Sequence, residues 1–368
     1  MKLLVVSTPV GPLGSGRGGG VELTLTGLVA GLLQRGHQLT VLAAEGSELS
    51  PACAGAALWT CPGALQPSCQ HQGRDAPVTL PAGGLLANLW RRALEAAPGE
   101  RFDAVLNLAY DWLPFWLTST AAVPIFHLVS MGSVSAAMDA VIAEVATWDQ
   151  RRLAFHTHAQ AGDFSLPSRP VVVGNGFDLE AYSFCAEPEP LLGWVGRIAP
   201  EKGLEDAAAA AALLGERLAV WGLVEDAAYA AAVEASVPAG TLDWRGFLPT
   251  AELQRQLGRC RALLNTPKWN EAYGNVVVEA MACGVPVVAY RRGGPGELVE
   301  PGVNGLLVEP DDVAALGHAA QAAAALDRRG CRAWVERHAS RQAFAARLEA
   351  WLQGGLSPSR AIGSHHLA

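Results

Sequence analysis

The sequence has few charged residues for its length. Asp, Glu, Lys and Arg make up 17% of its 368 residues, whereas hydrophobic residues make up 50%. The 27 basic residues are outnumbered by 35 acidic ones, which gives a net charge of −8, and no long block of Lys and Arg occurs. A nucleic-acid-binding surface needs such basic clusters, so we do not expect nucleic acid as a partner. A chain this apolar can bury a large core, which excludes general disorder.

Long hydrophobic runs and a secretory signal are also missing. The longest apolar region, residues 104–129, is broken by an Asn, an Asp and two Pro residues, so it predicts no transmembrane segment. The apolar start, residues 1–6, is too short for a signal peptide. Seven cysteines are an odd number, which does not suggest a disulfide framework. We therefore expect reduced thiols and a cytoplasmic location.

Spacings typical of metal sites are not found either. Cys53, Cys61, Cys69 and His71 lack the short Cys-x-x-Cys type of pair that zinc sites use. An Asp-x-Asp motif, which would hold a metal-bound diphosphate, occurs nowhere. We expect neither a metal nor a cofactor. Residues 46–84, rich in Gly, Pro and Cys, are interpreted as a long irregular loop, and the sequence leaves open whether this loop is a mobile flap.

The chain does contain a repeated alternation of strand-like and helix-like segments. Apolar runs such as residues 2–10 and 38–44 predict strands, and residues 21–35, which end at Gly36, predict a helix. The pattern restarts after a linker rich in Pro and Glu, residues 186–190. This alternation predicts an α/β fold with parallel, doubly wound sheets in two domains. The expected units are residues 1–185, residues 191–330, a last helix at 331–352 and a frayed tail at 353–368.

Two carboxylates stand eight residues apart in the segment Glu-Ala-Tyr-Gly-Asn-Val-Val-Val-Glu, residues 271–279. The turn residues around Gly274 predict that a helix starts near Tyr273, which leaves Glu271 on the preceding loop and Glu279 inside the helix. The free N–H groups at residues 273–275 would then form an anion site flanked by two acids. Such a site suits a ligand with phosphates and many hydroxyls, as a nucleotide sugar has.

A second group of charges lies on a strand-to-helix loop. The segment Gly-Arg-Ile-Ala-Pro-Glu-Lys-Gly, residues 196–203, supplies the planar guanidinium of Arg197 and the ammonium of Lys202. That pair suits a diphosphate. Each motif alone is more often a solvated surface, but their order and a separation of about 70 residues favour one shared site.

These two segments, followed by Ala-Met-Ala-Cys-Gly-Val-Pro-Val-Val at residues 280–288, resemble the retaining GT-B glycosyltransferases of family 4. The resemblance covers residues 171–326 and, more loosely, the N-terminal half. It implies a GT-B fold, in which two doubly wound, Rossmann-like domains face a central cleft and the last helix packs back on the first domain. The sequence departs from the family at residues 272–273, Ala-Tyr instead of Gly-Phe, and at residues 265–268, where Pro-Ser is common.

The resemblance also implies how a UDP-sugar donor is bound. Glu271 would hold the hydroxyls of the donor sugar, Glu279 the ribose diol, and Arg197 and Lys202 the diphosphate. His127 matches the family's strand-end histidine, which approaches the donor sugar. His127, Arg197, Lys202 and Glu271 are therefore the expected catalytic residues of a metal-free reaction that retains anomeric configuration. The other residues expected to bind the sugar donor are Gly19, Gly20, Phe247, Leu248, Tyr273, Gly274 and Asn275.

The first loop, residues 7–25, resembles the start of cyanobacterial pteridine glucosyltransferases, which transfer glucose from UDP-glucose to tetrahydrobiopterin. That resemblance implies a pteridine acceptor. Glu22 or Asp111 could grip the guanidine-like edge of a pterin, Trp112 or Trp116 could stack on its face, and Gly18 would allow close approach. Sugar, lipid or other small alcohol acceptors stay open, as do the identity of the hexose and the oligomeric state.

Two other classes of protein would explain parts of the sequence. Residues 14–19 spell Gly-x-Gly-x-x-Gly, the dinucleotide-binding fingerprint of an NAD-dependent oxidoreductase, and Glu45 follows at the end of the second expected strand. Pro9 and Pro12 lengthen this loop, however, and an oxidoreductase would leave the later charged motifs unexplained. A sugar- or nucleotide-binding protein without catalysis would use some of the eleven Trp residues as groove aromatics. Binding of the sugar donor without turnover would distinguish that class.

Overall fold

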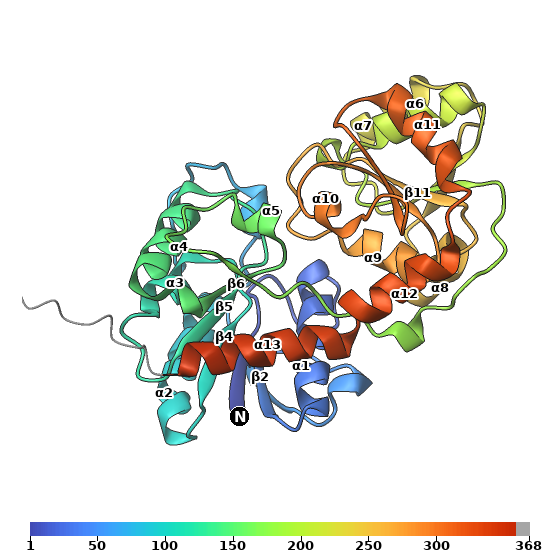
Figure 1. Cartoon of the computed structure of the whole chain (residues 1–368). Helices are drawn as coiled ribbons and strands as arrows, with labels where there is room; N and C mark the ends of the chain where they lie inside the picture. Colours follow the sequence, from blue (N-terminus) through green and yellow to red (C-terminus); the bar gives the residue numbers. More distant parts are fainter. Residues whose placement is uncertain (358–368) are drawn as a thin grey trace, which may run out of the picture.

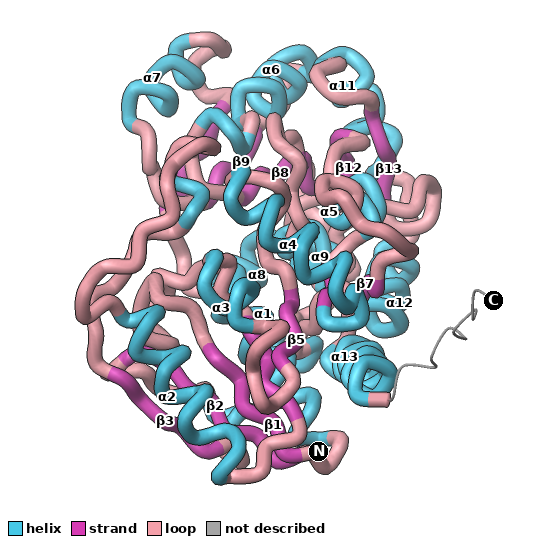
Figure 2. The backbone as a smooth tube through the Cα atoms, turned by 90° about the vertical axis from the view of Figure 1, so that its left-hand side faces the viewer, coloured by secondary structure: helices cyan, strands magenta, loops and turns pink. Residues whose placement is uncertain are grey.

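Two α/β domains make up the described part of the chain, residues 1–357 of a computed structural model (Figure 1). Each is built on a parallel sheet with its first strand in the interior of the strand order. The orders are β3-β2-β1-β4-β5-β6-β7 in the first domain and β10-β9-β8-β11-β12-β13 in the second. Figure 2 shows the strands of the two sheets gathered in separate halves of the molecule. The predicted α/β fold with two doubly wound sheets is confirmed.

The first domain contains seven strands and the helices that connect them. The strands are β1 (Lys2–Val6), β2 (Gln38–Ala44), β3 (Ala57–Cys61), β4 (Ala104–Asn107), β5 (Ile125–Leu128), β6 (Leu153–Phe155) and β7 (Val171–Val172). The helices are α1 (Gly20–Gln34), α2 (Leu85–Gly99), α3 (Trp112–Leu117), α4 (Ala136–Asp149) and α5 (His158–Ala161).

The second domain repeats this plan with six strands. They are β8 (Leu192–Val195), β9 (Leu218–Trp221), β10 (Leu242–Gly246), β11 (Ala262–Asn265), β12 (Val287–Tyr290) and β13 (Gly305–Val308). The helices are α6 (Leu204–Leu214), α7 (Ala227–Ala235), α8 (Thr250–Leu257), α9 (Asn275–Ala282), α10 (Pro295–Leu298), α11 (Val313–Ala323) and α12 (Arg328–His338).

In both sheets the direction of winding reverses beside the first strand. Val5 of β1 pairs with Val41 of β2 on one side and with Leu106 of β4 on the other. Strand β8 lies in the same way between β9 and β11. The connections leave such a pair of strands in opposite directions, so a crevice opens at the carboxyl ends. The loops after β1, β4, β8 and β11 are therefore the places where a ligand site is expected.

The C-terminal segment forms two helices where the sequence pattern predicts one over residues 331–352. Helix α12 packs on α9 of the second domain, whereas α13 (Arg341–Leu356) packs on α1 and lies along the first domain (Figure 1). The chain breaks because the Ser340 hydroxyl accepts the Ala343 N–H at 3.3 Å, which caps a new helix, and the Phe177 carbonyl accepts the Arg341 N–H. Since α13 continues to Leu356, the predicted tail begins too early. Its residues 358–368 lie outside the described part.

The segment at residues 46–84 is not a loop throughout. Strand β3 lies within it and pairs in parallel with β2, from Thr40 opposite Ala57 to Ala44 opposite Cys61. The Gly, Pro and Cys residues on both sides conceal this five-residue strand in the sequence. A short 3₁₀ turn, Cys69–His71, follows it and reaches the space between the domains.

Candidate active site

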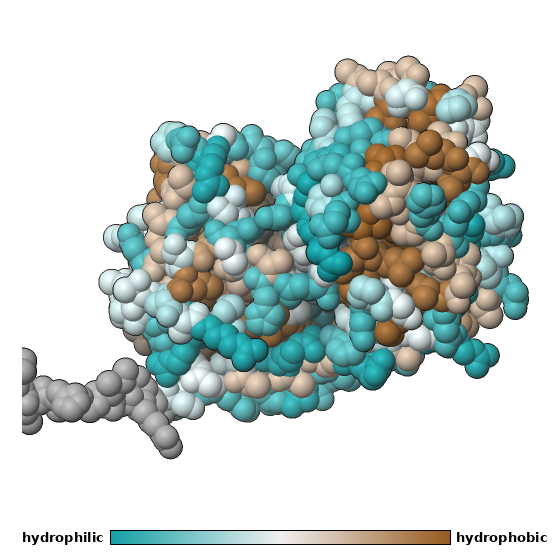
Figure 3. All heavy atoms as spheres, turned by 45° about the horizontal axis from the view of Figure 1, so that its top comes forward, coloured by the Kyte–Doolittle hydropathy of each residue, from teal (hydrophilic) through white to brown (hydrophobic). Residues whose placement is uncertain are grey.

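A cleft of about 760 Å³ lies between the two domains. Its walls are the four loops at the reversal points of the sheets, together with neighbouring segments. In Figure 3 the side of the C-terminal lobe that faces the other lobe is hydrophilic. The cleft is lined by the following residues predicted from the sequence: Gly18, Gly19, Gly20, Asp111, Arg197, Lys202, Phe247, Glu271, Tyr273, Gly274, Asn275 and Glu279. The predicted residues Glu22, Trp112, His127 and Leu248 are not part of its lining.

Lys202 and Glu271 form an ion pair on the C-terminal wall, with side chains only 20% and 11% exposed. The indole N–H of Trp269 also points to this carboxylate at 3.5 Å, and the ring centroid of Trp269 lies 5.1 Å from the Lys202 ammonium. Gly203 makes the approach possible, because a Cβ there would lie 1.9 Å from the carbonyl oxygen of Thr266. The motifs at 196–203 and 271–279 therefore meet at one point.

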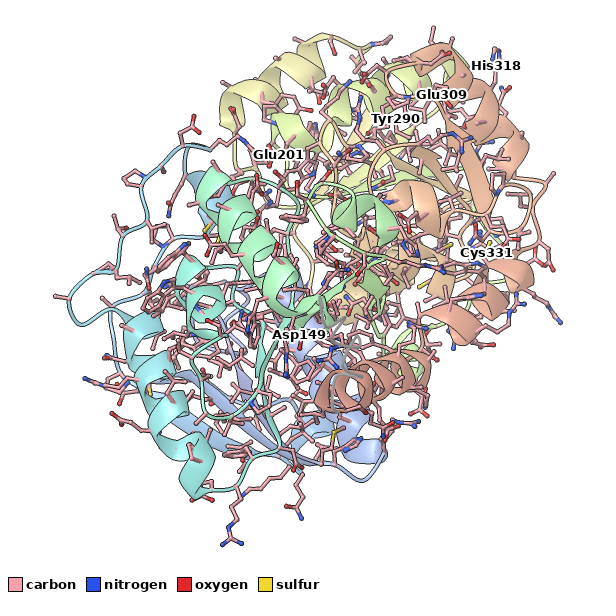
Figure 4. All side chains as sticks on the ribbon, turned by 60° about the vertical axis from the view of Figure 1, so that its left-hand side comes forward. Asp149, Glu201, Tyr290, Glu309, His318 and Cys331 are labelled. Carbon is pink, nitrogen blue, oxygen red and sulfur yellow. The ribbon has the colours of Figure 1, made fainter. Side chains whose placement is uncertain are left out.

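Arg197, the second predicted diphosphate ligand, lies between two carboxylates. Its guanidinium donates to Glu201 at 2.7 Å and also pairs with Glu225. Figure 4 shows Glu201 on the side of the second domain toward the first, whereas Glu309 and His318 lie at the far edge. Glu225, which follows β9, belongs to no motif that the sequence reveals. An entering diphosphate would replace carboxylates on both Arg197 and Lys202.

Helix α9 begins two residues later than predicted. Tyr273 is only 6% exposed and stacks on Phe177, and Gly274 precedes the helix with a left-handed φ of 98°. The N–H groups that open the helix are therefore those of Asn275 and Val276. Of the predicted residues 273–275, only Asn275 is among them. Glu279 lies one turn further on, accepts the Tyr182 hydroxyl at 3.2 Å, and has its pKa raised by burial.

The structure does not place His127, which was expected to be catalytic, in the cleft. The residue is 0% exposed in the core beneath α3, where its ring stacks on Phe115 with 4.0 Å between centroids. Asn107 donates to Nδ1 at 3.1 Å, so the proton sits on Nε2, which donates to the Thr118 hydroxyl oxygen at 2.7 Å. Burial lowers the pKa of His127 to about 3. Both ring nitrogens are therefore engaged inside the protein.

This burial predicts a pH effect on stability. The folded state resists protonation of His127, so its contribution to the free energy of unfolding is present above pH 6.5 and is lost as the pH falls toward 3. When the pH falls from 7.5 to 5.5, the free energy of unfolding of the wild type should decrease by about 1.4 kcal/mol more than that of His127→Gln. Urea unfolding at both pH values measures this difference. Burial raises the pKa of Asp111 and Glu279, and these shifts favour the folded state as the pH falls. Their effect is the same in the wild type and in His127→Gln, so it cancels in the comparison.

The exposed residue His158 provides the matched control. His158→Gln should follow the wild-type pH dependence. Equal losses in wild type and His127→Gln would contradict the buried, neutral state of His127. Catalytic activity of His127→Gln should stay within about threefold of wild type, because the side chain does not reach the cleft.

Glu22 does not face the cleft, which corrects its predicted role in acceptor binding. Its carboxylate accepts the backbone N–H groups of Gly14, Gly16 and Gly18 at 3.0, 3.3 and 2.8 Å. Gly14 and Gly16 have left-handed φ angles of 87° and 75°, a conformation that favours glycine. A dinucleotide fold would need free amides here for a pyrophosphate. Because Glu22 already binds them, the fingerprint at residues 14–19 does not form that site.

Because Glu22 holds this loop together, we expect its substitution to affect both substrates and the stability of the protein. Glu22→Gln should raise KM for the sugar donor and the acceptor together and lower the free energy of unfolding by about 0.5–1.5 kcal/mol, because three N–H groups of the loop lose a charged acceptor. Steady-state kinetics and urea unfolding measure this. The exposed neighbour Glu45→Gln should change neither quantity. An effect on acceptor KM alone would contradict this role.

The N-terminal wall differs in part from expectation. Trp112 stacks on Trp116, with ring centroids 5.5 Å apart and planes at 21°, and packs on the core instead of lining the cleft. Leu248 packs against the core of the second domain. The wall includes several residues that the sequence analysis missed: Thr8, Val10, Ser68, Cys69, Gln70, His71, Tyr110, Ser130, Met131, Gly132, His156 and Asn175. Those at 130–132 follow the end of β5, a signal that could have found them.

Two further properties concern residues 1–357 only. Within this range, no group of three or more His, Cys, Asp and Glu side chains is arranged to hold a metal ion. No helix in the same range has the length and apolar character needed to cross a membrane.

Parts of the chain are similar in sequence to known glycosyltransferases. Residues 189–325 match the family model described as Glycosyl transferases group 1. A 2-deoxystreptamine N-acetyl-D-glucosaminyltransferase of Streptomyces fradiae is 38% identical over 139 residues, which cover 36% of this chain and 33% of that protein. A D-inositol 3-phosphate glycosyltransferase of Geodermatophilus obscurus is 34% identical over 233 residues, 56% of this chain and 49% of that protein. The alignments thus span a third to a half of these relatives.

Solved structures match over nearly the whole chain. HepE of Anabaena in complex with UDP superimposes with a TM-score of 0.73 at 19% identity, covering 96% of this chain and 100% of that one. AviGT4, a glycosyltransferase involved in avilamycin A biosynthesis, has a TM-score of 0.71 at 21% identity, covering 97% and 98%. The fold of this protein is therefore GT-B.

Proposed function

We propose that this protein is a glycosyltransferase that moves a hexose, glucose in the first instance, from a UDP-sugar to a small hydroxylated acceptor. The observation that carries the proposal is the meeting of Arg197, Lys202, Glu271 and Glu279 in one cleft between two GT-B domains. The group 1 match over residues 189–325 covers the same four residues. HepE, which shares the fold, has been solved with UDP and with UDP-glucose.

The chemistry follows from the arrangement of charge. Departure of UDP builds negative charge on the diphosphate, and Arg197, Lys202 and the first N–H groups of α9 are the groups placed to stabilise it. Glu279 binds the ribose diol, and Glu271 binds hydroxyls of the transferred sugar. In the proposed reaction the acceptor attacks from the face that UDP leaves, with retention of configuration, and the donor phosphate accepts its proton without a metal ion. Enclosure between the domains limits hydrolysis.

The acceptor is less constrained than the sugar donor. A pteridine such as tetrahydrobiopterin loses the contacts expected from Glu22 and Trp112, since Glu22 binds its own loop and Trp112 stacks on Trp116. A cyclitol is the second candidate. The N-terminal wall offers the polar side chains of Ser68, Gln70, Asp111 and Ser130, which suit a ring with many hydroxyls. Relatives named for 2-deoxystreptamine and for inositol 3-phosphate point the same way.

One assay tests the proposal. The protein is incubated with UDP-glucose and, separately, tetrahydrobiopterin, 2-deoxystreptamine, myo-inositol and inositol 3-phosphate, and products are read by mass spectrometry. We expect a product heavier by one hexose with at least one acceptor, and activity that survives EDTA. Restoration of EDTA-lost activity by magnesium or manganese would contradict the metal-free reaction. Failure to bind UDP by calorimetry, with no UDP-sugar consumed, would overturn the function.

A further inference from the structure

Asp111 is a carboxylate at the carboxyl end of β4 that does not cap the helix it precedes. It occupies the N-cap position of α3 with extended backbone angles, φ −143° and ψ 147°, but its side chain accepts no N–H from that helix. An Asp in this position commonly accepts one of the first free N–H groups. The side chain lines the cleft instead.

The other acids of the cleft all have partners. Glu271 pairs with Lys202, Glu225 with Arg197, and Glu279 accepts the Tyr182 hydroxyl. Within residues 1–357, no hydrogen bond or ion pair reaches the carboxylate of Asp111. Burial of this carboxylate raises its pKa to about 7, a sign that its charge lacks a compensating group.

The wall around Asp111 is built for a small ligand. The turn Cys69–His71 lies next to it, with the Cys69 thiol pointing to the Tyr110 carbonyl at 3.2 Å. The Tyr110 hydroxyl donates to the Gly132 carbonyl at 3.0 Å, which ties the loop after β4 to the loop after β5. Arg17 lines the same side of the cleft, and no bond joins it to Asp111.

We propose that Asp111 binds a protonated amine of the acceptor, which makes an aminocyclitol or amino sugar the substrate class. This inference rests on the proposed function and deepens it. A cationic amine supplies both the charge and the N–H donors that the carboxylate lacks, whereas a hydroxyl supplies one neutral donor. An acceptor phosphate would instead meet a carboxylate of the same sign. Asp111 therefore sets specificity and takes no part in bond cleavage.

The test compares two acceptors that differ only in the groups at the two amine positions. 2-Deoxystreptamine and its analogue with hydroxyls in place of both amines are offered with UDP-glucose to wild type, Asp111→Asn and Asp75→Asn. Wild type should favour the diamine in kcat/KM. Asp111→Asn should lose about 10- to 100-fold for the diamine, as expected for one charged hydrogen-bonded contact, and clearly less for the hydroxyl analogue, so the preference for the diamine falls. Asp75 is exposed and outside the cleft, so Asp75→Asn should match wild type.

Several outcomes would overturn the amine assignment. They are equal use of both acceptors by wild type, an undiminished preference in Asp111→Asn, or transfer only to uncharged or phosphorylated acceptors. Hydrolysis of UDP-glucose with transfer to neither acceptor would also overturn it, while leaving the sugar-donor chemistry standing. Absence of both UDP binding and UDP-glucose consumption would instead be a failure of the proposed function.

Discussion

Replacing Arg197 or Lys202 by alanine should cost about 2–4 kcal/mol of transition-state stabilisation, which lowers kcat/KM for UDP-sugar turnover by roughly 30- to 900-fold. Each cation lies on the C-terminal wall at the junction of the two charged motifs and is held there by carboxylates: Glu201 and Glu225 for Arg197, and Glu271 for Lys202. The diphosphate replaces these partners, and its charge grows as the bond to the sugar breaks. The loss should therefore be larger in kcat than in UDP affinity.

A matched control exists on the far side of the same domain. Arg291 pairs with Glu309 at 3.0 Å, both side chains are largely exposed, and neither lines the cleft. Arg291→Ala removes the same charge and should change kcat/KM less than about twofold, since exposed ion pairs contribute little. Because Lys202→Ala also strips Glu271 of its partner, a cycle of Lys202→Ala, Glu271→Ala and the double variant separates the two causes. If Lys202→Ala lowered kcat/KM no more than Arg291→Ala does, Lys202 would not be a ligand of the diphosphate.

The two acids should fail in different ways. Glu279→Ala should weaken UDP binding by about 10- to 100-fold, the loss expected for a charged hydrogen-bonded contact with the ribose. Glu271→Ala should lower kcat strongly while UDP affinity stays constant or rises, because Lys202 is then free of the ion pair that it makes in the unliganded protein. Calorimetry with UDP and turnover of UDP-glucose, measured on the same preparations, give the two quantities.

Glu309→Ala serves as the carboxylate control and should alter neither measurement. Equal losses of UDP affinity in the Glu271 and Glu279 variants would contradict the division between sugar and ribose. A loss of UDP affinity confined to Glu271→Ala would reverse the two assignments.

The sequence alone was sufficient for the repeating pattern and for the charged motifs of the C-terminal domain. Alternating apolar strands and helices dictate a doubly wound sheet, since a parallel strand needs a crossover and the crossover helix needs an apolar face to cover. Arg197, Lys202, Glu271 and Glu279 were found because they sit in local motifs beside strand ends, where such a sheet always opens a crevice. Motifs of this kind can be recognised from the sequence because their residues are close together in the chain.

Only the tertiary structure decided the direction of individual side chains. His127 stands near the end of β5, but its ring points under α3, where Asn107 and Thr118 bond it. Glu22 opens α1, but the loop before it folds back so that its amides reach the carboxylate. The sequence around His127 and Glu22 does not reveal these contacts. Each contact depends on how a helix or loop packs against its neighbours in the folded chain.

Long-range packing also set the boundaries that local patterns misplace. Ser340 starts a new helix because the chain pairs there with Phe177, more than 150 residues earlier in the sequence. The turn Cys69–His71 reaches the cleft from a segment without periodicity, because β3 anchors that segment to the sheet edge. Residue types and short spacings thus determined the fold class and identified the residues proposed to bind the sugar donor. The N-terminal wall, including Asp111, is assembled from loops that come together only when the first sheet has formed.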